Sequence, residues 1–363
     1  MNGPVNKEPI CIVLKRMLMK VAASSLFSSC GRKLLLFLAS RYQVQTAKDG
    51  TVRFPFVKRR SEGNVQILVY HRVNDEYDPF FPAVPIQVFA QQMDYLVSNY
   101  HVCSLDEAVT RLKTRDVPDK VVVVTFDDGY RDNHAYAFPI LKQCAIPATI
   151  FLATNSIGTG KILWHDRLFS AFRETKEMTL FDYHPEVAIC RIRTLDEKLK
   201  AMWKVIRVLR RMNDVTRDEW LEHLVARLNV PKKCEDKTLM LSWDEVKAMA
   251  QHGILFGAHT ANHPILSRLD PQRVREEIRA SSQAIESNLG VAPKTFAYPN
   301  GLRDDFNGTT KALLQEAGFQ CAVTSMFGTN DSHQDLFELR RGQPWEHHLP
   351  TFAAKLSWYR MVS

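Results

Sequence analysis

The chain has 363 residues, of which 45% are hydrophobic and 24% charged, with a mean hydropathy of −0.23. This composition excludes disordered, collagen-like and coiled-coil proteins, and the length suits either two domains or one large α/β barrel. The net charge of +8 comes from residues 1–60, which carry +10, so the remaining −2 argues against a nucleic-acid partner for the body of the protein.

Residues 1–62 form a basic N-terminal extension. The chain contains no run of about 18 apolar residues, which argues against a membrane-spanning helix. Residues 11–22 place apolar side chains on one helical face, while Lys15, Arg16 and Lys20 lie elsewhere. Three alternatives stay open: a helix packed on the protein's own surface, peripheral contact with an anionic membrane, or a targeting signal. We therefore expect a location in the cytoplasm or at the membrane periphery, with export as a further alternative.

The body of the chain alternates regularly between strand and helix patterns from residue 66 onward. Short apolar runs predict buried parallel strands at 66–70, 121–126, 148–152, 254–258, 295–298 and 321–324, with a weaker one at 101–104. Helical patterns lie at 85–100, 105–114, 136–144, 271–289 and 309–317. Such repetition predicts a parallel α/β sheet, either open or closed into a barrel.

Residues 160–241 interrupt this alternation. They lack clear strands and are rich in charged residues and helix formers, which predicts a helical insertion within a catalytic domain spanning 63–350. Long insertions after strand ends often form lids or substrate walls, so we count Trp164 and His165, which open this one, as candidates for substrate contact. The alternative for this phrase is local packing with an Asp166–Arg167 ion pair. Residues 351–363 read as a C-terminal tail.

Reactive side chains follow the predicted strands. His71 follows the strand at 66–70, Asp127 and Asp128 follow 121–126, and His259 and His263 follow 254–258. The C-terminal ends of parallel strands meet on one face, where active sites of α/β proteins form. These segments are therefore expected to converge in one pocket.

The two histidines and the paired carboxylates together suit a catalytic metal site. Pro264 disfavours a helix at His263, so both imidazoles lie on a loop. Two histidines and one carboxylate leave a divalent metal with an open position, as in catalytic zinc sites. The second carboxylate can then take a proton from water activated by the metal.

The segments Thr125–Gly129 and His259–His263 resemble the first two motifs of the polysaccharide deacetylase family, also called carbohydrate esterase family four or the NodB homology domain. Residues 296–301 resemble its third motif. The resemblance implies a distorted (β/α) barrel of about seven parallel strands. It also implies that Asp127 is the catalytic base and that a divalent metal, most often Zn²⁺, is held by Asp128, His259 and His263.

In the third motif, the resemblance implies that the residue after Pro299, here Asn300, lends a backbone N–H to the oxyanion. Many family members have tyrosine at this position. Tyr298 and Pro299 join the candidates for substrate contact.

The general acid departs from the usual family pattern, because no convincing Leu-x-His motif lies near the C-terminus. Residues 68–73 instead resemble the N-terminal motif of circularly permuted exopolysaccharide deacetylases, in which the acid histidine comes first in the chain. His71 is therefore the predicted acid. Arg340 and Arg341 follow a short apolar run. The resemblance implies that one of them pairs with Asp127, as an arginine does in the family, and we prefer Arg341.

These assignments predict a metal-dependent hydrolase that removes N-acetyl groups from an amino-sugar glycan, either a polysaccharide or a lipid-linked glycan. The enzymatic alternatives are an O-acetyl esterase and a deacetylase of small amides. A non-catalytic glycan-binding protein is a third alternative, against which the intact Asp and His motifs argue. The seven scattered cysteines include no Cys-x-x-Cys pair, so we expect free thiols and no thiolate zinc site.

Overall fold

The structure is a computed structural model in which residues 45–46, 52–53, 63–181, 184–231 and 235–362 are described. The chain divides into two compact units, Met1–Arg60 and Ser61–Ser363. In the first unit, β1 (Gln45–Thr46) and β2 (Val52–Arg53) pair antiparallel, and the helix predicted at 11–22 lies outside the described residues. Among the described residues, no helix is both long enough and apolar enough to cross a membrane.

The second unit is built on a sheet of seven parallel strands, and all seven were predicted from the sequence. The sheet order is β11-β10-β9-β6-β5-β3, with β4 also pairing with β5. The strands are β3 (Val65–Tyr70), β4 (His101–Val102), β5 (Val121–Phe126), β6 (Ala148–Leu152), β9 (Leu255–Ala258), β10 (Thr295–Ala297) and β11 (Cys321–Val323). In β3 and β5 every residue is buried, which explains why they read as continuous apolar runs.

The sheet curls into a distorted barrel, as the sequence predicted. Residues 339–342 lie between its two outermost strands. Leu339 N–H donates to Ala322 of β11, while Gly342 N–H donates to Ile67 of β3 over 2.8 Å. This segment therefore bridges the gap that the seven strands leave open.

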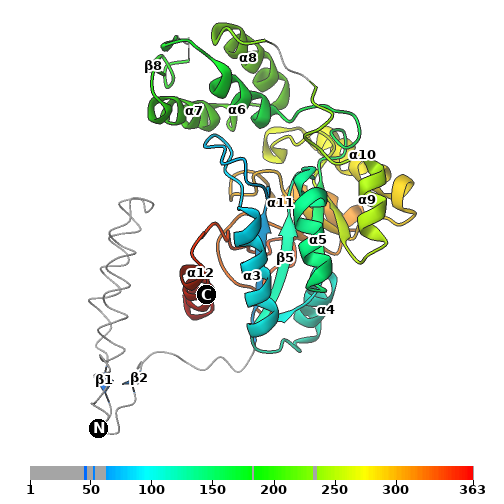
Figure 1. Ribbon diagram of the computed structural model, residues 1–363. Coiled ribbons are helices and arrows are strands. Elements are labelled where there is room, and N and C mark those ends of the chain that lie inside the picture. The colour runs from blue at the N-terminus through cyan, green and yellow to red at the C-terminus, as the bar shows by residue number, and fades with distance from the viewer. Residues whose placement is uncertain (1–44, 47–51, 54–62, 182–183, 232–234, 363) are drawn as a thin grey trace, which may run out of the picture. The chain divides into compact units, whose positions relative to one another are not determined.

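Helices flank the sheet, and in Figure 1 α3 and α5 run alongside β5. The predicted helices are confirmed as α3 (Ile86–Asn99), α4 (Leu105–Thr114), α5 (Phe138–Gln143), α10 (Pro271–Leu289) and α11 (Gly308–Glu316). A π-helical turn, η1 (Asn133–Ala137), leads into α5, and a 3₁₀ turn, η2 (Leu266–Arg268), precedes α10. The sequence analysis missed α9 (Trp243–Ala250), although Ser242 and Glu245 form a capping box at its start.

The expectation that residues 351–363 form a C-terminal tail was wrong. Residues predicted to form a tail lie in a helix, α12 (Leu349–Val362). Phe352, Leu356 and Tyr359 are at most 2% exposed and join the main hydrophobic core. This helix therefore belongs to the catalytic domain.

The insertion folds around a hydrophobic core of its own, which includes Leu168, Phe172, Met202 and Leu224. Its helices are α6 (Trp164–Glu174), α7 (Leu195–Leu209) and α8 (Asp214–Arg227). The predicted helical insertion is therefore present, but it also contains an antiparallel hairpin of β7 (Thr179–Phe181) and β8 (Ile189–Arg191) that the sequence analysis did not predict. These strands are three residues long each, too short to show a periodic pattern.

Candidate active site

Asp128, His259 and His263 meet at the C-terminal ends of β5 and β9, as predicted. Asp128 Oδ1 lies 3.5 Å from His259 Nε2 and 3.3 Å from His263 Nε2. The three ligand atoms lie within 4.8 Å of one another, and the residues are 1–4% exposed. Asp128 Oδ1 is a buried acceptor with no hydrogen-bond partner among the described residues, which is how a carboxylate oxygen that awaits a cation would look.

The groups around this trio suit a metal ion. His259 Nδ1 lies 2.7 Å from the carbonyl oxygen of Ala297, to which it donates, so Nε2 is left as the ligand atom. Burial is the largest influence on Asp128 and would raise its pKa, but His259 and His263 together hold the pKa well below its usual range. Burial lowers the pKa of His263, which favours the neutral imidazole that binds metals. Burial would lower the pKa of His259 as well, but its hydrogen bond to Asp128 and the charge of Asp127 raise it. One carboxylate and two imidazoles in their neutral form are a fitting donor set for a divalent ion such as zinc.

The backbone of the site is held in conformations that side chains seldom adopt. Asp128, Thr260, His263 and Asn300 all have φ between 57° and 73°. Such left-handed residues persist only where the surroundings hold them, and they cluster at functional sites. Gly129 follows Asp128 with φ of 86°, so the Asp-Asp-Gly turn needs its glycine here.

Asp127 lies beside the trio and is bound by Arg341. The guanidinium donates from Nη1 to Oδ1 and from Nη2 to Oδ2, each over 2.7 Å. Both side chains are almost fully buried. Burial alone would raise the pKa of Asp127, but the charge of Arg341, aided by His259, holds the pKa below its ordinary value. The pairing predicted for Arg341 is therefore present, and Arg340 is exposed.

His71 follows β3 and is half-buried on the same face. Its positive charge is near enough to contribute to the lowered pKa of Asp127, behind the larger effects of burial, Arg341 and His259. Asn133 Nδ2 donates to the carbonyl oxygen of His71 over 2.8 Å and so fixes the backbone at this position. The imidazole faces Phe81 with ring centroids 6.1 Å apart.

Asn300 offers donors to the site, whereas Tyr298 does not. Among the described residues, neither the backbone N–H of Asn300 nor its buried Nδ2 has a hydrogen-bond acceptor. Tyr298 is 1% exposed, stacks on Phe306 at 4.1 Å and donates its hydroxyl to Phe337. The expectation that Tyr298 contacts substrate was therefore wrong, because its side chain points into the core. Pro299 is also buried.

Of the two residues of the insertion predicted to contact substrate, Trp164 and His165, the structure brings His165 to the Asp128–His259–His263 trio. His165 Nε2 lies 3.9 Å from Asp128 Oδ2, and its ring centroid is 5.0 Å from that of His263. Burial lowers the pKa of His165 to about 3, although Asp128 acts in the opposite direction. Trp164 is 5% exposed and packs into the core of the insertion.

Several residues of the site escaped the sequence analysis. The Tyr130 hydroxyl lies 3.0 Å from His165 Nε2 and 3.0 Å from both oxygens of Asp166. Burial, with the charge of Asp128, raises the pKa of Asp166 to about 8. Arg72 Nε and Asn74 Nδ2 each donate to Asp132 over 2.8 Å, which anchors the loop after His71.

Glu277 is the most informative omission. It lies on α10 and is 3% exposed. Its Oε2 accepts the backbone N–H groups of Ala261 and Asn262 over 2.9 Å, and its Oε1 accepts Asn262 Nδ2 over 2.7 Å. It thereby holds the loop between the two histidines. Its position beside the buried Val274 and Ile278 on an amphipathic helix was the available signal.

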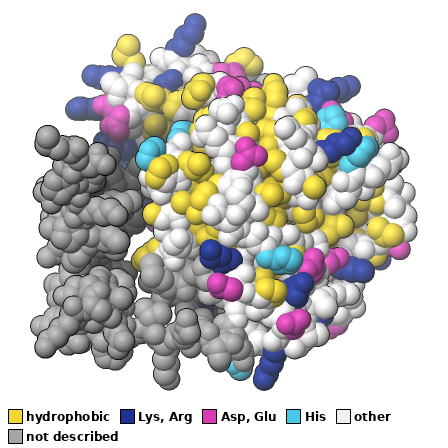
Figure 2. Space-filling view, turned by 60° about the horizontal axis from the view of Figure 1, so that its bottom comes forward, with side chains coloured by type: hydrophobic (Ala, Val, Ile, Leu, Met, Phe, Trp, Pro, Cys, Tyr) yellow, Lys and Arg dark blue, Asp and Glu magenta, His cyan; other side chains and the backbone are white. Residues whose placement is uncertain are grey.

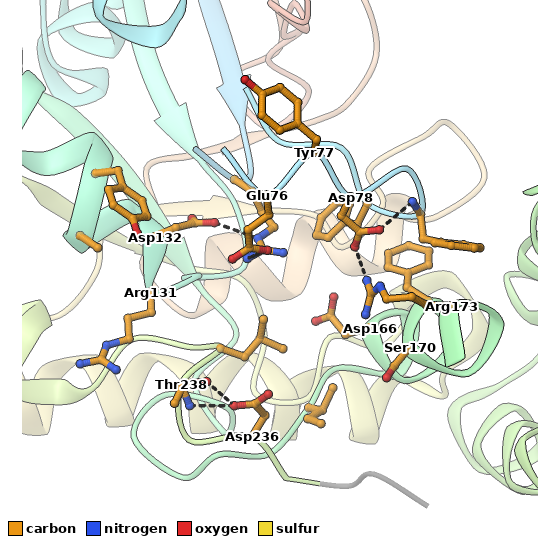
Figure 3. Close-up of a pocket in the computed structure, with 18 of the residues that line it drawn as sticks. Glu76, Tyr77, Asp78, Arg131, Asp132, Asp166, Ser170, Arg173, Asp236 and Thr238 are labelled. Carbon is orange, nitrogen blue, oxygen red and sulfur yellow. Dashed lines mark hydrogen bonds and ion pairs between the residues drawn. The ribbon is translucent and has the colours of Figure 1, made fainter. Parts of the chain in front are cut away.

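Figure 3 shows a cavity of about 990 Å³ whose wall does not include Asp127, Asp128, His259 or His263. It lies near the centre through Phe81 in its wall, whose ring centroid is 6.1 Å from that of His71 and 6.2 Å from that of His165. Its wall includes Asp166 and Arg72 together with the aromatic side chains of Phe80, Phe81 and Phe169. Its arginines are paired with carboxylates, for example Arg72 with Asp132 and Arg131 with Glu245, each over 2.8 Å. A large cleft with aromatic walls and fixed polar groups is typical of a ligand site.

Comparison with known proteins places these features in context. A family model described as polysaccharide deacetylase matches residues 114–322. YxkH of Bacillus subtilis, whose name assigns it to the polysaccharide deacetylases, is 24% identical over 301 residues, which is 82% of this chain and 77% of that protein. The poly-beta-1,6-N-acetyl-D-glucosamine N-deacetylase of Staphylococcus epidermidis is 26% identical over 214 residues, which is 56% of this chain and 70% of that protein.

Two solved structures share the fold. The deacetylase PplD of Streptococcus pyogenes, in complex with acetate, has a TM-score of 0.55 at 20% identity and covers 84% of this chain and 100% of its own. IcaB from Ammonifex degensii has a TM-score of 0.52 at 21% identity and covers 82% of this chain and 98% of its own.

Proposed function

The chain belongs to the polysaccharide deacetylase family, a family of glycan-deacetylating hydrolases, and on that premise we propose that it cleaves N-acetyl groups from an amino-sugar glycan with the aid of a divalent metal ion. The observation that carries this proposal is the position of Asp127. This buried carboxylate is held in its ionised form by Arg341 and lies directly beside the Asp128–His259–His263 trio. Asp127 is thus in position to act as a base beside the candidate metal site.

Asp128, His259 and His263 would hold the metal ion. Zinc fits this donor set, and when bound it supplies Lewis-acid activation of water and of the acetyl carbonyl group.

Two side chains of the protein then carry out the proton transfers, Asp127 as the base and His71 as the acid. Asp127 accepts a proton from the water whose oxygen bonds to the carbonyl carbon. The free N–H of Asn300 is available to stabilise the negative oxygen of the resulting tetrahedral intermediate. His71 donates a proton to the sugar nitrogen as the C–N bond breaks, which yields acetate and a free amine.

The proposed choice of an amide over an ester rests on His71. An amide nitrogen leaves poorly as an anion and needs a proton donor, whereas an alkoxide leaves more readily. A relative named as a poly-N-acetylglucosamine N-deacetylase supports the same choice. The aromatic cavity beside the centre is large enough to accept a glycan rather than a small amide.

Acetate release from a panel of substrates tests the proposal. We expect release from N-acetylated oligosaccharides, loss of activity with a chelator and recovery with zinc. Asp127→Asn should keep the metal and lose about 100-fold or more in turnover, the usual contribution of a positioned base. Release only from O-acetylated glycans or from small amides would contradict the proposal, as would an active Asp127→Asn variant.

A second experiment isolates the role of His71. His71→Ala should keep the metal but lose about 100-fold in amide cleavage. The rate of cleavage of an acetate ester with a good leaving group should fall much less, because such a group departs with little protonation. Equal losses on both substrates would mean that His71 is not the acid.

A further inference from the structure

Asp305 is a buried carboxylate that connects the insertion to residues 299–302, which we call the Asn300 turn. It is 3% exposed, and its Oδ2 accepts the backbone N–H of Leu302 over 2.8 Å. The same oxygen accepts Nη2 of Arg210 over 2.6 Å. Leu302 belongs to the Asn300 turn, whereas Arg210 directly follows α7 of the insertion. One carboxylate oxygen therefore joins two segments that are far apart in the sequence.

The Asn300 turn has a backbone conformation that needs restraint. Asn300 and Gly301 have φ of 59° and 67°, both in the left-handed region. A residue with a side chain seldom adopts this region, and it persists there only where the surroundings hold it. Two contacts supply that restraint, because the Gly301 carbonyl oxygen accepts the N–H of Ser325 over 2.8 Å and Asp305 accepts the N–H of Leu302. Asp305 thus helps to fix the residue whose N–H is the candidate oxyanion donor.

Asp305 also links this turn to the segment that follows His263. In η2, the N–H of Ser267 donates to the carbonyl oxygen of Asp305 over 3.0 Å. The Ser267 hydroxyl donates to the carbonyl oxygen of Asp304 over 2.5 Å. The segments that carry Asn300 and His263 are therefore joined through one short stretch of chain.

Arg210 is the cation on which this arrangement depends. Its Nε is buried and has no hydrogen-bond partner among the described residues, so the guanidinium is held through the contact of Nη2 with Asp305. A buried carboxylate is unfavourable unless a cation pairs with it. Without Arg210, Asp305 would take up a proton or turn towards water, and either change weakens its hydrogen bond to the Leu302 N–H.

We propose that Arg210 and Asp305 are positioning residues for the oxyanion donor, so that the insertion, through Arg210, fixes the turn that presents the N–H of Asn300. The inference rests on the proposed function, in which that N–H stabilises the negative oxygen of the tetrahedral intermediate. Both side chains act through the turn rather than on the substrate. Since the donor must lie where the oxyanion develops, a small movement of the turn lowers the rate without weakening substrate binding.

Kinetics with an N-acetylated oligosaccharide and with an activated acetate ester provide the test. Arg210→Met should lower kcat about 10-fold and change KM less than about 3-fold, whereas complete loss of an oxyanion donor costs about 100- to 1,000-fold. The loss should be the same on both substrates, because a tetrahedral oxyanion forms on each. This pattern differs from that expected for His71→Ala, which affects the amide selectively. Arg210→Lys keeps a cation beside Asp305 and should recover most of the activity.

Further variants distinguish positioning from a general effect on the fold. Asp305→Asn removes the charge but keeps the shape of the side chain, and it should lower kcat to a similar extent. If Arg210→Met does not fold, Asp305→Asn carries the same test. The double variant should lose no more than the more impaired single variant, because the two residues act as one unit. Arg211→Met is the matched control, since Arg211 is exposed and pairs with Glu186 inside the insertion.

Three results would overturn the inference. The first is an unchanged kcat in both Arg210→Met and Asp305→Asn, with or without a rise in KM. The second is an equal loss of activity in Arg211→Met. The third is a loss of bound metal that accounts for the loss of activity in the Arg210 and Asp305 variants.

Amide hydrogen exchange separates this inference from the proposed function. If the protein releases no acetate from any substrate, the proposed function fails. Faster exchange of residues 299–302 in Arg210→Met than in the parent protein and in Arg211→Met would still support the role of the pair in fixing the turn. Unchanged exchange of this segment would overturn that role. Acetate release that Arg210→Met leaves unaffected would overturn the inference alone and leave the proposed function intact.

Discussion

At the scale of single residues, Arg341 determines how Asp127 ionises. Its guanidinium spans both carboxylate oxygens inside the barrel, where the two groups have little contact with water. A carboxylate whose pKa is lowered in the folded state stabilises the protein above its unfolded pKa. This contribution is lost as the pH falls through the folded pKa. The same pairing keeps the base ionised in mildly acidic solution.

Removing this cation should shift the pH dependence of catalysis. In Arg341→Met the pKa of Asp127 rises, because burial then acts unopposed by its nearest cation. The acid limb of the kcat/KM profile should therefore move to higher pH, and the unpaired carboxylate should destabilise the fold by about 3–5 kcal/mol. Arg340→Met, a change at the exposed neighbour, should leave both unchanged. An unshifted acid limb in Arg341→Met would show that another group controls it.

Glu277 allows a residue-scale test of metal affinity. In Glu277→Ala, the loop between His259 and His263 loses three hydrogen-bond acceptor contacts. Metal affinity, measured by competition with a chromogenic chelator, should fall about 10- to 100-fold, as for other residues that orient ligands. Glu286→Ala removes an exposed carboxylate from the same helix and is the matched control. Unchanged affinity in Glu277→Ala would mean that the loop holds its conformation without it.

At the scale of elements, the segment at residues 339–342 and helix α12 complete the α/β domain. Residues 339–342 join β3 to β11 and carry Arg341 into the barrel, so the same segment closes the sheet and positions the base. Helix α12 packs against this segment, with the Tyr359 ring against Gly342. It is also joined to β3, because Gln66 Nε2 donates to the Leu356 carbonyl oxygen over 3.1 Å. The C-terminal helix is thus linked to the first strand of the sheet.

The stability of the domain should depend on α12. Phe352 is 1% exposed in the main core, so Phe352→Ala should lower the free energy of unfolding by about 3–5 kcal/mol in denaturant titrations. Ser357→Ala, at an exposed position of the same helix, should change it by less than about 0.5 kcal/mol. A Phe352→Ala variant as stable as the parent protein would show that the helix is dispensable.

At the scale of the whole molecule, charge is unevenly distributed along the chain. Residues 1–60 carry a net charge of +10, and the remainder carries −2. On the face shown in Figure 2, acidic and basic side chains of the described residues are interspersed, and neither sign dominates. The basic segment contains no residue of the candidate site, so catalysis and surface attachment can be tested separately.

We propose that the basic extension attaches the enzyme peripherally to membranes that contain anionic lipids. Deleting residues 1–60 should leave turnover of soluble substrates intact and abolish co-sedimentation with vesicles that contain anionic lipid. Binding by the full chain should weaken as salt rises, because the attraction between exposed charges is screened. Co-sedimentation that survives the deletion would assign attachment to another part of the protein.

The sequence by itself was sufficient to predict the strands, the convergence of Asp128, His259 and His263, and, through the family resemblance, the pairing of Asp127 with Arg341. Parallel strands buried on both faces read as apolar runs, and their ends carry the reactive residues, so both signals are local. Tertiary structure decided the rest. The Tyr298 side chain points into the core, the segment expected to be a tail forms α12, and Glu277 holds the loop of the two histidines from a helix that is distant in sequence. Their roles depend on which neighbour each buried polar group meets, and that is settled only when separate elements pack together.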